Sequence, residues 1–456
     1  MTETLVMVDP GFLGEYGIGK WGRSYWSSAI NHGVAQIAGV CKAHGVGVHL
    51  MDLRCYPSYD EFEKEIKKRR EKWYAITCRT VDVPVVENII AIIRRQKPDA
   101  KIVVGGIHVN LVPGIYAADN RIDHVFLGEA DITMPQLLAD PGKFSKIVKG
   151  EIPVIDDIPF EDIDIYDYDK STSFTLYGGI VKAPMIPVIT SRGCVYNCKF
   201  CQPAERILYG SRYRQKSVAR IMEEIKRIAE NHEFNSIMFY DDCILGQKKI
   251  LHELLEKLAA FKKIEIMLQG RADNICQWGD EIRKLKDYGL KAVIVGFESG
   301  SQRILDFIGK GTTVEQNMLA GEILHKSGIK IVGNFMIGLP TEQKDEMDAT
   351  ALLAEKIRPT IASCSFYSPM PGSHIYDYCN DNELIIEKNF ERLSRDPRKP
   401  KIKMVDYAFA NTILPRIVGS RFNNRFVKKL VGYAYKNMNR GILREAMTRL
   451  YNKVAK

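Results

Sequence analysis

Short apolar runs alternate with stretches of helical periodicity through the N-terminal part of the chain. The runs predict strands at Thr4–Asp9, Val46–Asp52, Trp73–Arg79, Lys101–Val104 and His124–Leu127. The stretches between them predict helices near Gly33–His44, Tyr59–Lys72 and Val83–Gln96. Apolar strands that alternate with helices are typical of a parallel sheet with helices on both faces. Such a fold binds ligands beyond the carboxyl ends of its strands.

Glycine-rich or polar loops follow four of these predicted strands, at Asp9–Gly14, Arg79–Asp82, Gly105–His108 and Gly128–Asp131. Because glycine has no side chain, it lets the backbone come close to a large ligand. No G-x-G-x-x-G sequence opens the first helix, which argues against a dinucleotide as that ligand.

A second series of predicted strands follows in the middle of the chain. They lie at Pro187–Ser191, Ser236–Tyr240, Ile264–Gln269, Ala292–Phe297, Ile331–Ile337 and Ile361–Phe366. Helical stretches such as Ser217–Asn231 and Lys248–Phe261 separate them. Between the two series, Ile152–Asp169 is acidic and interrupted by prolines. We interpret it as an extended linker over the surface between two domains.

Three cysteines stand close together directly after the first strand of the second series. Cys194, Cys198 and Cys201 form a C-x3-C-x2-C sequence. Three thiolates can hold three irons of a [4Fe–4S] cluster and leave the fourth iron open to a small molecule. The alternatives are a zinc site and chance clustering. Zinc usually requires a fourth ligand at matching spacing, and the sequence has no second C-x2-C.

This triplet, with Phe200 before its last cysteine, resembles that of the radical S-adenosylmethionine (SAM) superfamily. The resemblance implies a partial (β/α)6 barrel, and SAM bound to the open iron through its amino and carboxylate groups. Electron transfer would cleave SAM to a 5′-deoxyadenosyl radical. The preceding α/β domain resembles the flavodoxin-like, Rossmann-type cobalamin-binding domain of the class B, cobalamin-dependent members. We therefore expect a cobalamin-binding domain (1–140), a linker (141–183), a radical SAM partial barrel (184–385) and a basic helical C-terminal region (386–456).

The resemblance also implies SAM contacts at the ends of the barrel strands. Asp241 or Asp242 would accept a hydrogen bond from the SAM amino group; the alternative is a solvated or helix-capping pair. Arg271 would pair with the SAM carboxylate, or instead form an ion pair at the barrel mouth. Glu298 resembles an acceptor for a ribose hydroxyl. The complete set of expected SAM-binding residues is Phe200, Tyr240, Asp241, Asp242, Arg271, Glu298, Ser299, Asn334, Ile337 and Gly338.

The cobalamin contacts are expected in the glycine-rich loops. The implied set is Asp9, Gly11, Gly14, Thr80, Val81, Asp82, Gly105, Gly106, His108, Gly128 and Glu129. Some cobalamin proteins have a D-x-H-x-x-G motif whose histidine binds cobalt, and Gly11 stands at the position of that histidine. We therefore expect no protein histidine on cobalt, and interpret His108 as a hydrogen-bonded loop residue. The alternative for the whole domain is a regulatory or purely architectural role.

The implied activity is methylation of an unactivated carbon. A 5′-deoxyadenosyl radical would remove a hydrogen from the substrate, the carbon radical would take a methyl group from methylcobalamin, and a second SAM would remethylate the cobalt. Two alternatives remain open: a non-methylating relative that performs a cyclisation, oxidation or rearrangement, and a non-catalytic cobalamin or redox sensor. Methylthiotransferases have a similar barrel, but carry a cysteine-bearing first domain and a C-terminal β-domain that are not evident here. The substrate classes that the resemblance leaves open are a peptide or protein side chain, a lipid and a small metabolite.

Composition adds an expectation about location. The 456 residues are 45% hydrophobic and 27% charged, with no run of 18 apolar residues and no signal peptide, so we expect a cytoplasmic protein without a membrane span. The ten cysteines then argue against a disulfide framework. The oxygen-sensitive cluster favours an anaerobic setting.

Charge is concentrated at the C-terminus. Residues 406–456 hold eleven Lys and Arg against two acids, whereas the whole chain has a net charge of +9. We predict a helix over Ile417–Met438 with Phe422, Phe426, Leu430 and Tyr433 on one face, and another over Gly441–Val454. The two helices either cover the barrel or recruit an anionic partner. Candidate partners are a low-potential electron donor such as a flavodoxin or ferredoxin, an acidic protein substrate and an anionic membrane surface; no nucleic-acid-reading module accompanies the charge.

Overall fold

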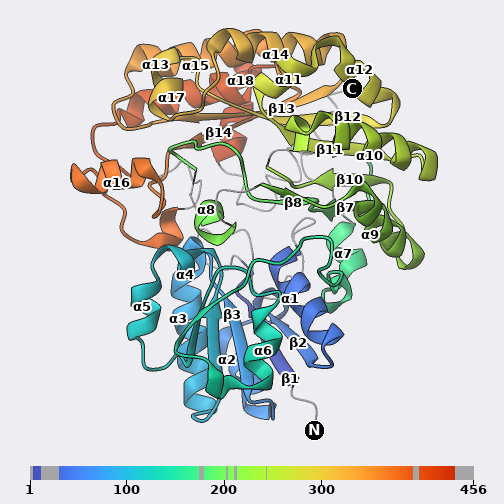
Figure 1. Ribbon diagram of the computed structural model, residues 1–456. Coiled ribbons are helices and arrows are strands. Elements are labelled where there is room, and N and C mark those ends of the chain that lie inside the picture. Colours follow the sequence, from blue (N-terminus) through green and yellow to red (C-terminus); the bar gives the residue numbers. More distant parts are fainter. Residues whose placement is uncertain are drawn as a thin grey trace.

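The computed structural model describes residues 4–11, 30–173, 179–201, 204–209, 213–242, 244–393 and 400–436. It contains two parallel six-stranded sheets, one in each half of the chain, with α8 (Ala204–Tyr209) lying between the two halves (Figure 1). The first sheet has the strand order β2-β1-β3-β4-β5-β6. Its strands are β1 (Thr4–Asp9), β2 (Gly47–Asp52), β3 (Trp73–Thr77), β4 (Lys101–Gly105), β5 (His124–Leu127) and β6 (Ile147–Lys149). The predicted α/β class with parallel sheets is confirmed.

Helices cover both faces of the first sheet because its strands are apolar on both sides. Leu5 and Met7 of β1 pack in one core with α1 and α6, whereas Val6 and Val8 pack in the other with α2 and α3. The helices of this half are α1 (His32–Ala43), α2 (Tyr59–Lys68), α3 (Val83–Gln96), α4 (Ile107–Leu111), α5 (Pro113–Ala118) and α6 (Thr133–Ala139). Strand β6 was not predicted, and it extends this sheet beyond residue 140, where we expected the domain to end.

The second sheet has the strand order β14-β13-β12-β11-β10-β7 and is the predicted set of six parallel strands. Its strands are β7 (Met185–Val188), β10 (Ser236–Phe239), β11 (Glu265–Gly270), β12 (Leu290–Glu298), β13 (Lys330–Ile337) and β14 (Ile361–Phe366). Its main covering helices are α9 (Val218–Asn231), α10 (Lys248–Phe261), α11 (Ala272–Trp278), α12 (Ile282–Asp287), α13 (Gln302–Phe307), α14 (Val314–Lys326) and α15 (Lys344–Ile357). A separate apolar cluster fills the concave side, with Met185, Met238 and Met267 packed beneath Ile180 and Val181.

The carboxyl ends of the two sheets face each other across the domain interface. Helix α8, which follows the cysteine loop, contacts α4, which follows Gly106. The segment after β14 also reaches α4, since a Cβ on Gly372 would lie 2.3 Å from Leu111. The carboxyl ends of the two sheets, where the predicted ligand loops lie, are therefore brought together.

The linker does more than cross the surface between the domains. Its Ile152–Asp169 part is irregular as expected, apart from one 3-10 turn and the start of α7 (Tyr168–Thr172), yet Tyr166 and Tyr168 are buried. Its backbone passes directly over α1, where a Cβ on Gly39 would lie 2.0 Å from the Phe160 carbonyl oxygen. The Arg220 guanidinium of α9 stacks 3.5 Å from the centre of the Phe160 ring. The linker thus packs against both domains.

The C-terminal region differs from the prediction. It follows α16 (His374–Asp381) and holds α17 (Tyr407–Val418) and α18 (Arg425–Lys436), so the single helix predicted from Ile417 is instead broken around Gly419. The helix predicted over Gly441–Val454 lies outside the described residues. No helix in the described part of the chain is long and apolar enough to span a membrane.

The buried face of α18 is also the opposite of the predicted one. Phe426 is 74% exposed and Tyr433 57%, whereas Val431 is buried. The reason is close packing against α17, because a Cβ on Gly432 would lie 2.6 Å from Pro415. The Tyr435 hydroxyl reaches the free edge of β14, where it accepts from the Cys364 N–H at 3.1 Å and donates to the Cys364 carbonyl at 2.8 Å.

Candidate active site

The cysteine loop leaves the barrel at the carboxyl end of β7. It starts and ends on a small antiparallel pair, β8 (Ser191–Arg192) and β9 (Arg214–Gln215). Cys194 and Cys198 are partly exposed and Cys201 is exposed. The loop is tied to the barrel rim, since the Lys199 N–H donates to the Ile308 carbonyl at 2.8 Å and the Lys199 carbonyl accepts from the Ile375 N–H at 3.1 Å. The three thiols are thus presented at the domain interface on an anchored loop.

Among the described residues, no three His, Cys, Asp or Glu side chains are grouped closely enough to hold a single metal ion. The ligands of an iron–sulfur cluster need not converge in this way, because each thiolate binds a different iron.

Arg271 lies beside the cysteine loop at the end of β11. Its guanidinium stacks 3.6 Å from the centre of the Tyr196 ring, and its Nη1 lies 3.5 Å from the Cys198 sulfur. Its Nε donates to Asp273 at 3.0 Å, so the ion pair at the barrel mouth that we considered is present. A positive charge next to a cluster thiolate stabilises the anionic form. This arrangement suits Arg271 to hold the cysteine loop in place.

Asp241 is buried at the end of β10, directly beneath the cysteine loop. Its Oδ1 accepts hydrogen bonds from the Thr190 backbone and hydroxyl, both at 2.9 Å, and from the Ser191 hydroxyl. Its Oδ2 is also buried and has no hydrogen-bond partner among the described residues. Burial raises the pKa of Asp241 to about 6, although these hydrogen bonds oppose the shift. A buried carboxylate oxygen without a partner fits the amino group of SAM, whereas Asp242 is exposed.

Glu298 and Phe200 meet around one lysine. The Lys310 Nζ donates to Glu298 Oε1 at 3.0 Å and lies 5.7 Å from the centre of the Phe200 ring. The Lys310 carbonyl accepts a hydrogen bond from Arg271. Since Lys310 binds Glu298 at the end of β12 and Arg271 follows β11 and contacts Cys198, these contacts link both strand ends to the cysteine loop. Glu298 adopts a positive φ of 61°, which turns the chain sharply at the end of its strand.

The other expected SAM residues divide between the two sides of the barrel wall. Tyr240 packs beside the apolar cluster on the concave side, and Asn334 follows Val332 of that cluster by two positions on the same strand. The side chains of Ser299 and Ile337 instead face the helical layer, where Ser299 lies 3.2 Å from the Thr350 hydroxyl of α15. Gly338 adopts a positive φ of 75°, and its N–H donates to Glu342. Only backbone atoms of Ser299, Ile337 and Gly338 are therefore suited to contact a ligand.

Several expected cobalamin residues are held by a charged cluster at the ends of β1 and β3. The Asp9 carboxylate accepts from the Gly11 N–H at 3.1 Å and from the Tyr166 hydroxyl at 2.9 Å. Arg79 pairs with Asp82, and its Nη2 lies 3.5 Å from Asp9 Oδ1. Asp82 is fully buried, and its Oδ1 has no hydrogen-bond partner in the part of the chain that is described. That oxygen is suited to a polar group of a bound cofactor.

His108 is a packed and neutral side chain. Its Nδ1 lies 3.2 Å from the Thr80 hydroxyl, and its ring packs edge-on against Phe390 with 5.1 Å between the centres. Burial lowers the pKa of His108 to about 4. His108 is thus hydrogen-bonded as we interpreted, but it lies in the short helix α4 rather than in a loop.

The glycines of these loops have local packing roles. A Cβ on Gly106 would lie 2.8 Å from the Cys78 backbone nitrogen, and one on Gly11 would lie 2.5 Å from the Arg54 side chain. Gly128 also has a positive φ, and its N–H donates to the Asn110 side chain at 2.8 Å. Gly105 ends β4, Val81 lies in the 3-10 turn Thr80–Asp82, and Gly14 lies outside the described residues.

Glu129 has partners that the sequence did not suggest. Its carboxylate binds Arg192 of β8 and Arg214 of β9, and the neighbouring Asp131 also binds Arg192. We expected Glu129 to contact cobalamin, but it joins the N-terminal domain to the base of the cysteine loop. The arginines lie directly beside the cysteine motif, yet nothing local to the sequence identifies partners more than sixty residues away.

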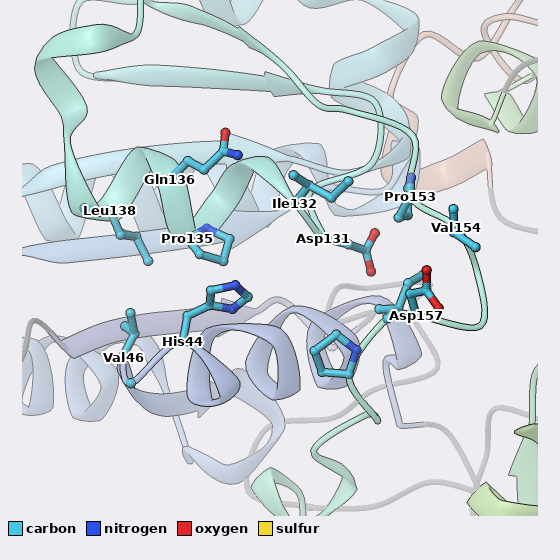
Figure 2. Close-up of a pocket in the computed structure, with 14 residues that line it drawn as sticks. His44, Val46, Asp131, Ile132, Pro135, Gln136, Leu138, Pro153, Val154 and Asp157 are labelled. Carbon is cyan, nitrogen blue, oxygen red and sulfur yellow. The ribbon is translucent and has the colours of Figure 1, made fainter.

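A cleft of about 860 Å³ lies away from the cysteine loop, between α1, α6 and the linker (Figure 2). Its walls are mainly apolar, with Ile132, Pro135 and Leu138 on α6 or just before it and Pro153 and Val154 on the linker. His44 lines one part of the cleft and Asp131 another. The cleft borders the domain interface at Asp131, which binds Arg192, and at Pro153, whose carbonyl accepts from Arg214 at 3.2 Å.

Comparison with known proteins agrees with this architecture. Residues 25–138 match the B12 binding domain, and residues 188–354 match the radical SAM superfamily. An uncharacterized methyltransferase of Pyrococcus horikoshii is 26% identical over 85% of this chain and 87% of its own length. The anaerobic magnesium-protoporphyrin IX monomethyl ester cyclase of Rubrivivax gelatinosus is 26% identical over 76% of this chain and 67% of its own length.

Among solved structures, the radical SAM methyltransferase TsrM of Kitasatospora setae has the same fold. It superposes over the whole of both chains with a TM-score of 0.68 at 14% identity. The chain belongs to the radical SAM enzymes that carry a B12-binding domain. Its cofactors are therefore a [4Fe–4S] cluster, SAM and cobalamin, as the sequence predicted, and it requires an electron donor.

Proposed function

We propose that this enzyme methylates an unactivated carbon of its substrate, with SAM as both radical source and methyl donor and cobalamin as methyl carrier. The observation that carries this proposal is that the carboxyl ends of the two sheets face each other, as the contacts between α4 and α8 show. A substrate that must meet both cofactors requires such an arrangement, because reacting groups need close and oriented approach. The similarity to the Pyrococcus horikoshii methyltransferase over most of both chains supports it further.

The side chains at the barrel mouth have distinct proposed tasks. Cys194, Cys198 and Cys201 hold the cluster. SAM bound to the cluster would supply the radical after it receives an electron from it. Asp241 Oδ2 accepts from the SAM amino group, because it is a buried carboxylate oxygen at the end of β10 that has no hydrogen-bond partner among the described residues. Arg271 positions the cysteine loop through Tyr196 and Cys198. Lys310 orients Glu298 toward a ribose hydroxyl.

On the facing domain, the loops at the ends of β3, β4 and β5 are the proposed cobalamin contacts. Thr80 offers a hydroxyl, Val81 offers backbone groups, and Asp82 offers Oδ1, which has no partner in the part of the chain that the structure describes. Gly105, Gly106 and Gly128 offer backbone groups, and the positive φ of Gly106 and Gly128 lets the chain turn there. His108 takes no part in binding cobalt, because its ring is packed between neighbouring groups.

A second candidate is a non-methylating reaction such as a ring closure. It is favoured by the similarity to the Rubrivivax gelatinosus cyclase, which has the same identity over a somewhat smaller part of this chain. Both reactions begin with hydrogen removal in this account, and the entry of a methyl group into the product distinguishes them.

Isotope labelling of the host tests the proposal and seeks the substrate at once. Cells grown with methyl-deuterated methionine, with and without the gene, are compared by mass spectrometry. We expect a product that carries a CD3 group in the wild type and is missing from the deletion strain. A product that depends on the gene but gains no label from methionine would overturn methylation in favour of the second candidate.

A further inference from the structure

The base of the cysteine loop carries two arginines side by side. Arg192 of β8 and Arg214 of β9 lie opposite each other in the antiparallel pair, and Cys194 follows Arg192 by two residues. Like charges placed directly opposite on neighbouring strands destabilise the pairing. The pair therefore needs anions to neutralise it.

Those anions come from the other domain. Arg192 donates to Asp131 through Nη1 at 2.7 Å and Nη2 at 2.9 Å, and both arginines bind Glu129. The carboxylates are 1% and 5% exposed for Glu129 and Asp131, and both arginine side chains are 16% exposed. We name these four residues, Arg192, Arg214, Glu129 and Asp131, the interdomain clasp. Separating the partners of such a cluster would leave a buried charge uncompensated, which is costly. The clasp therefore favours one relative position of the two domains.

Each half of the clasp is fixed within its own domain. On the barrel side, Asp241 Oδ1 binds the backbone and hydroxyl of Thr190, and Gln215 donates to the Thr190 hydroxyl at 2.7 Å. On the other side, the Glu129 backbone packs against Gly150, where a Cβ would lie 1.8 Å from the Glu129 carbonyl oxygen. Movement of the cysteine loop relative to the β5 loop is therefore restrained by rigid groups at both ends.

We propose that Glu129 and Asp131 are positioning residues that set the separation between the iron–sulfur cluster and cobalamin. The clasp joins the residue two positions before Cys194 to the residue directly after Gly128, which lies in a proposed cobalamin loop. A displacement of about 1 Å can cost on the order of a hundredfold in rate when two groups must react together. This inference rests on the presence of both cofactors and holds for either candidate reaction.

The separation of the two cofactors can be measured directly. Cob(II)alamin and the one-electron-reduced cluster are both paramagnetic, so pulsed electron paramagnetic resonance on the reconstituted holoenzyme reports the distance between them. Asp131→Asn removes the charge that faces both Arg192 amino groups. Arg192→Lys keeps the charge but loses the two-pronged contact, and should fold if the first variant does not. Asp123→Asn is the matched control, because Asp123 pairs with Arg94 at 3.0 Å within the N-terminal domain.

We expect one narrow distance in the wild type and in Asp123→Asn, and a shifted or broadened distance in Asp131→Asn and Arg192→Lys at unchanged iron and cobalamin content. Dithionite-driven formation of 5′-deoxyadenosine should persist in the clasp variants, while substrate turnover per 5′-deoxyadenosine falls by about tenfold or more. An unchanged distance in Arg192→Lys with full cofactor content would overturn the proposal and leave the clasp a merely stabilising contact. If the enzyme did not methylate its substrate, the distance between the two cofactors could still be measured and would still test the role of the clasp.

Discussion

His32 of α1 donates a hydrogen bond from Nδ1 to Glu161 of the linker, with 2.7 Å between the two atoms. Both side chains are largely buried, and the Lys216–Glu224 ion pair lies in the same electrostatic neighbourhood. Burial by itself would lower the pKa of His32, but the charge and hydrogen bond of Glu161 outweigh it and raise the pKa above its usual value. The contact between α1 and the linker therefore contains a histidine whose charged form is favoured by the fold.

This pair makes stability depend on pH. A raised pKa in the folded state contributes stability that is fully present below the unfolded value of about 6.5 and is lost as the pH rises through the folded value. We expect the melting temperature to fall as the pH rises above about 6.5. His32→Gln should flatten this dependence, whereas His44→Gln, at the other end of α1, should not. Equal pH slopes in wild type and His32→Gln would show that another group is responsible.

Asp241 should control SAM binding through its unpartnered oxygen. In Asp241→Asn, Oδ1 remains for the Thr190 contacts but an NH2 group replaces Oδ2, so we expect SAM affinity to fall by about tenfold to a hundredfold. Affinity in the wild type should also fall as the pH drops through about 6, where Asp241 becomes protonated. Equilibrium binding measured by calorimetry on the anaerobic protein checks both effects. Asp242→Asn is the control, and a larger loss in that variant would reverse the assignment.

His108 should not be a ligand of cobalt. Because its ring is buried beside Phe390 and its pKa is lowered to about 4, we expect the cob(II)alamin spectrum to be the same in the wild type and in His108→Phe. Loss of the Thr80 hydrogen bond should cost about 1 kcal/mol of stability. Electron paramagnetic resonance decides the matter, since nitrogen splitting that disappears in the variant would prove a cobalt–histidine bond.

The basic C-terminal region should serve the electron donor rather than the chemistry. Lys428 is not available for this, because it pairs with Glu355 of α15 at 2.7 Å, so the test uses the exposed Arg425 and Lys429. Reversing both charges should leave dithionite-driven SAM cleavage unchanged and slow turnover with an acidic flavodoxin several-fold, and salt should mimic the defect. Reversal of Lys64 and Lys68 on α2 provides the control. Wild-type turnover by the Arg425/Lys429 variant at low and high salt would place donor docking elsewhere.

Elements were predicted correctly from the sequence where the pattern that defines them lies within the element itself. Strands β1 and β5 and helices α3 and α10 have the predicted bounds, because their apolar runs or periodicity lie wholly within each element. Strand β6 was missed because three residues at the edge of a sheet carry too little periodic pattern. The face of α18 was misjudged because packing on Pro415 selected the side with Gly432 over the side with the larger apolar residues.

The candidate site shows the same limit. Cysteine spacing identified the cluster loop directly, since the ligands are neighbours in sequence. The carboxylates at the ends of the N-terminal strands could not be sorted in this way. Asp82 retains an oxygen without a partner among the described residues, whereas Glu129 binds Arg192 and Arg214. Which of these carboxylates faces a ligand depends on how the two domains pack together. The residues that determine this packing are far apart in the chain.

The fate of SAM in the reconstituted, reduced enzyme with extracts of its host tests the central claim most directly. Methylation of an unactivated carbon consumes two SAM molecules per product, so 5′-deoxyadenosine and S-adenosylhomocysteine should accumulate in equal amounts. Cys198→Ala should abolish 5′-deoxyadenosine formation, whereas Cys379→Ala, at a buried cysteine outside the triplet, should retain it. Steady formation of 5′-deoxyadenosine with no S-adenosylhomocysteine would contradict the methyltransferase account.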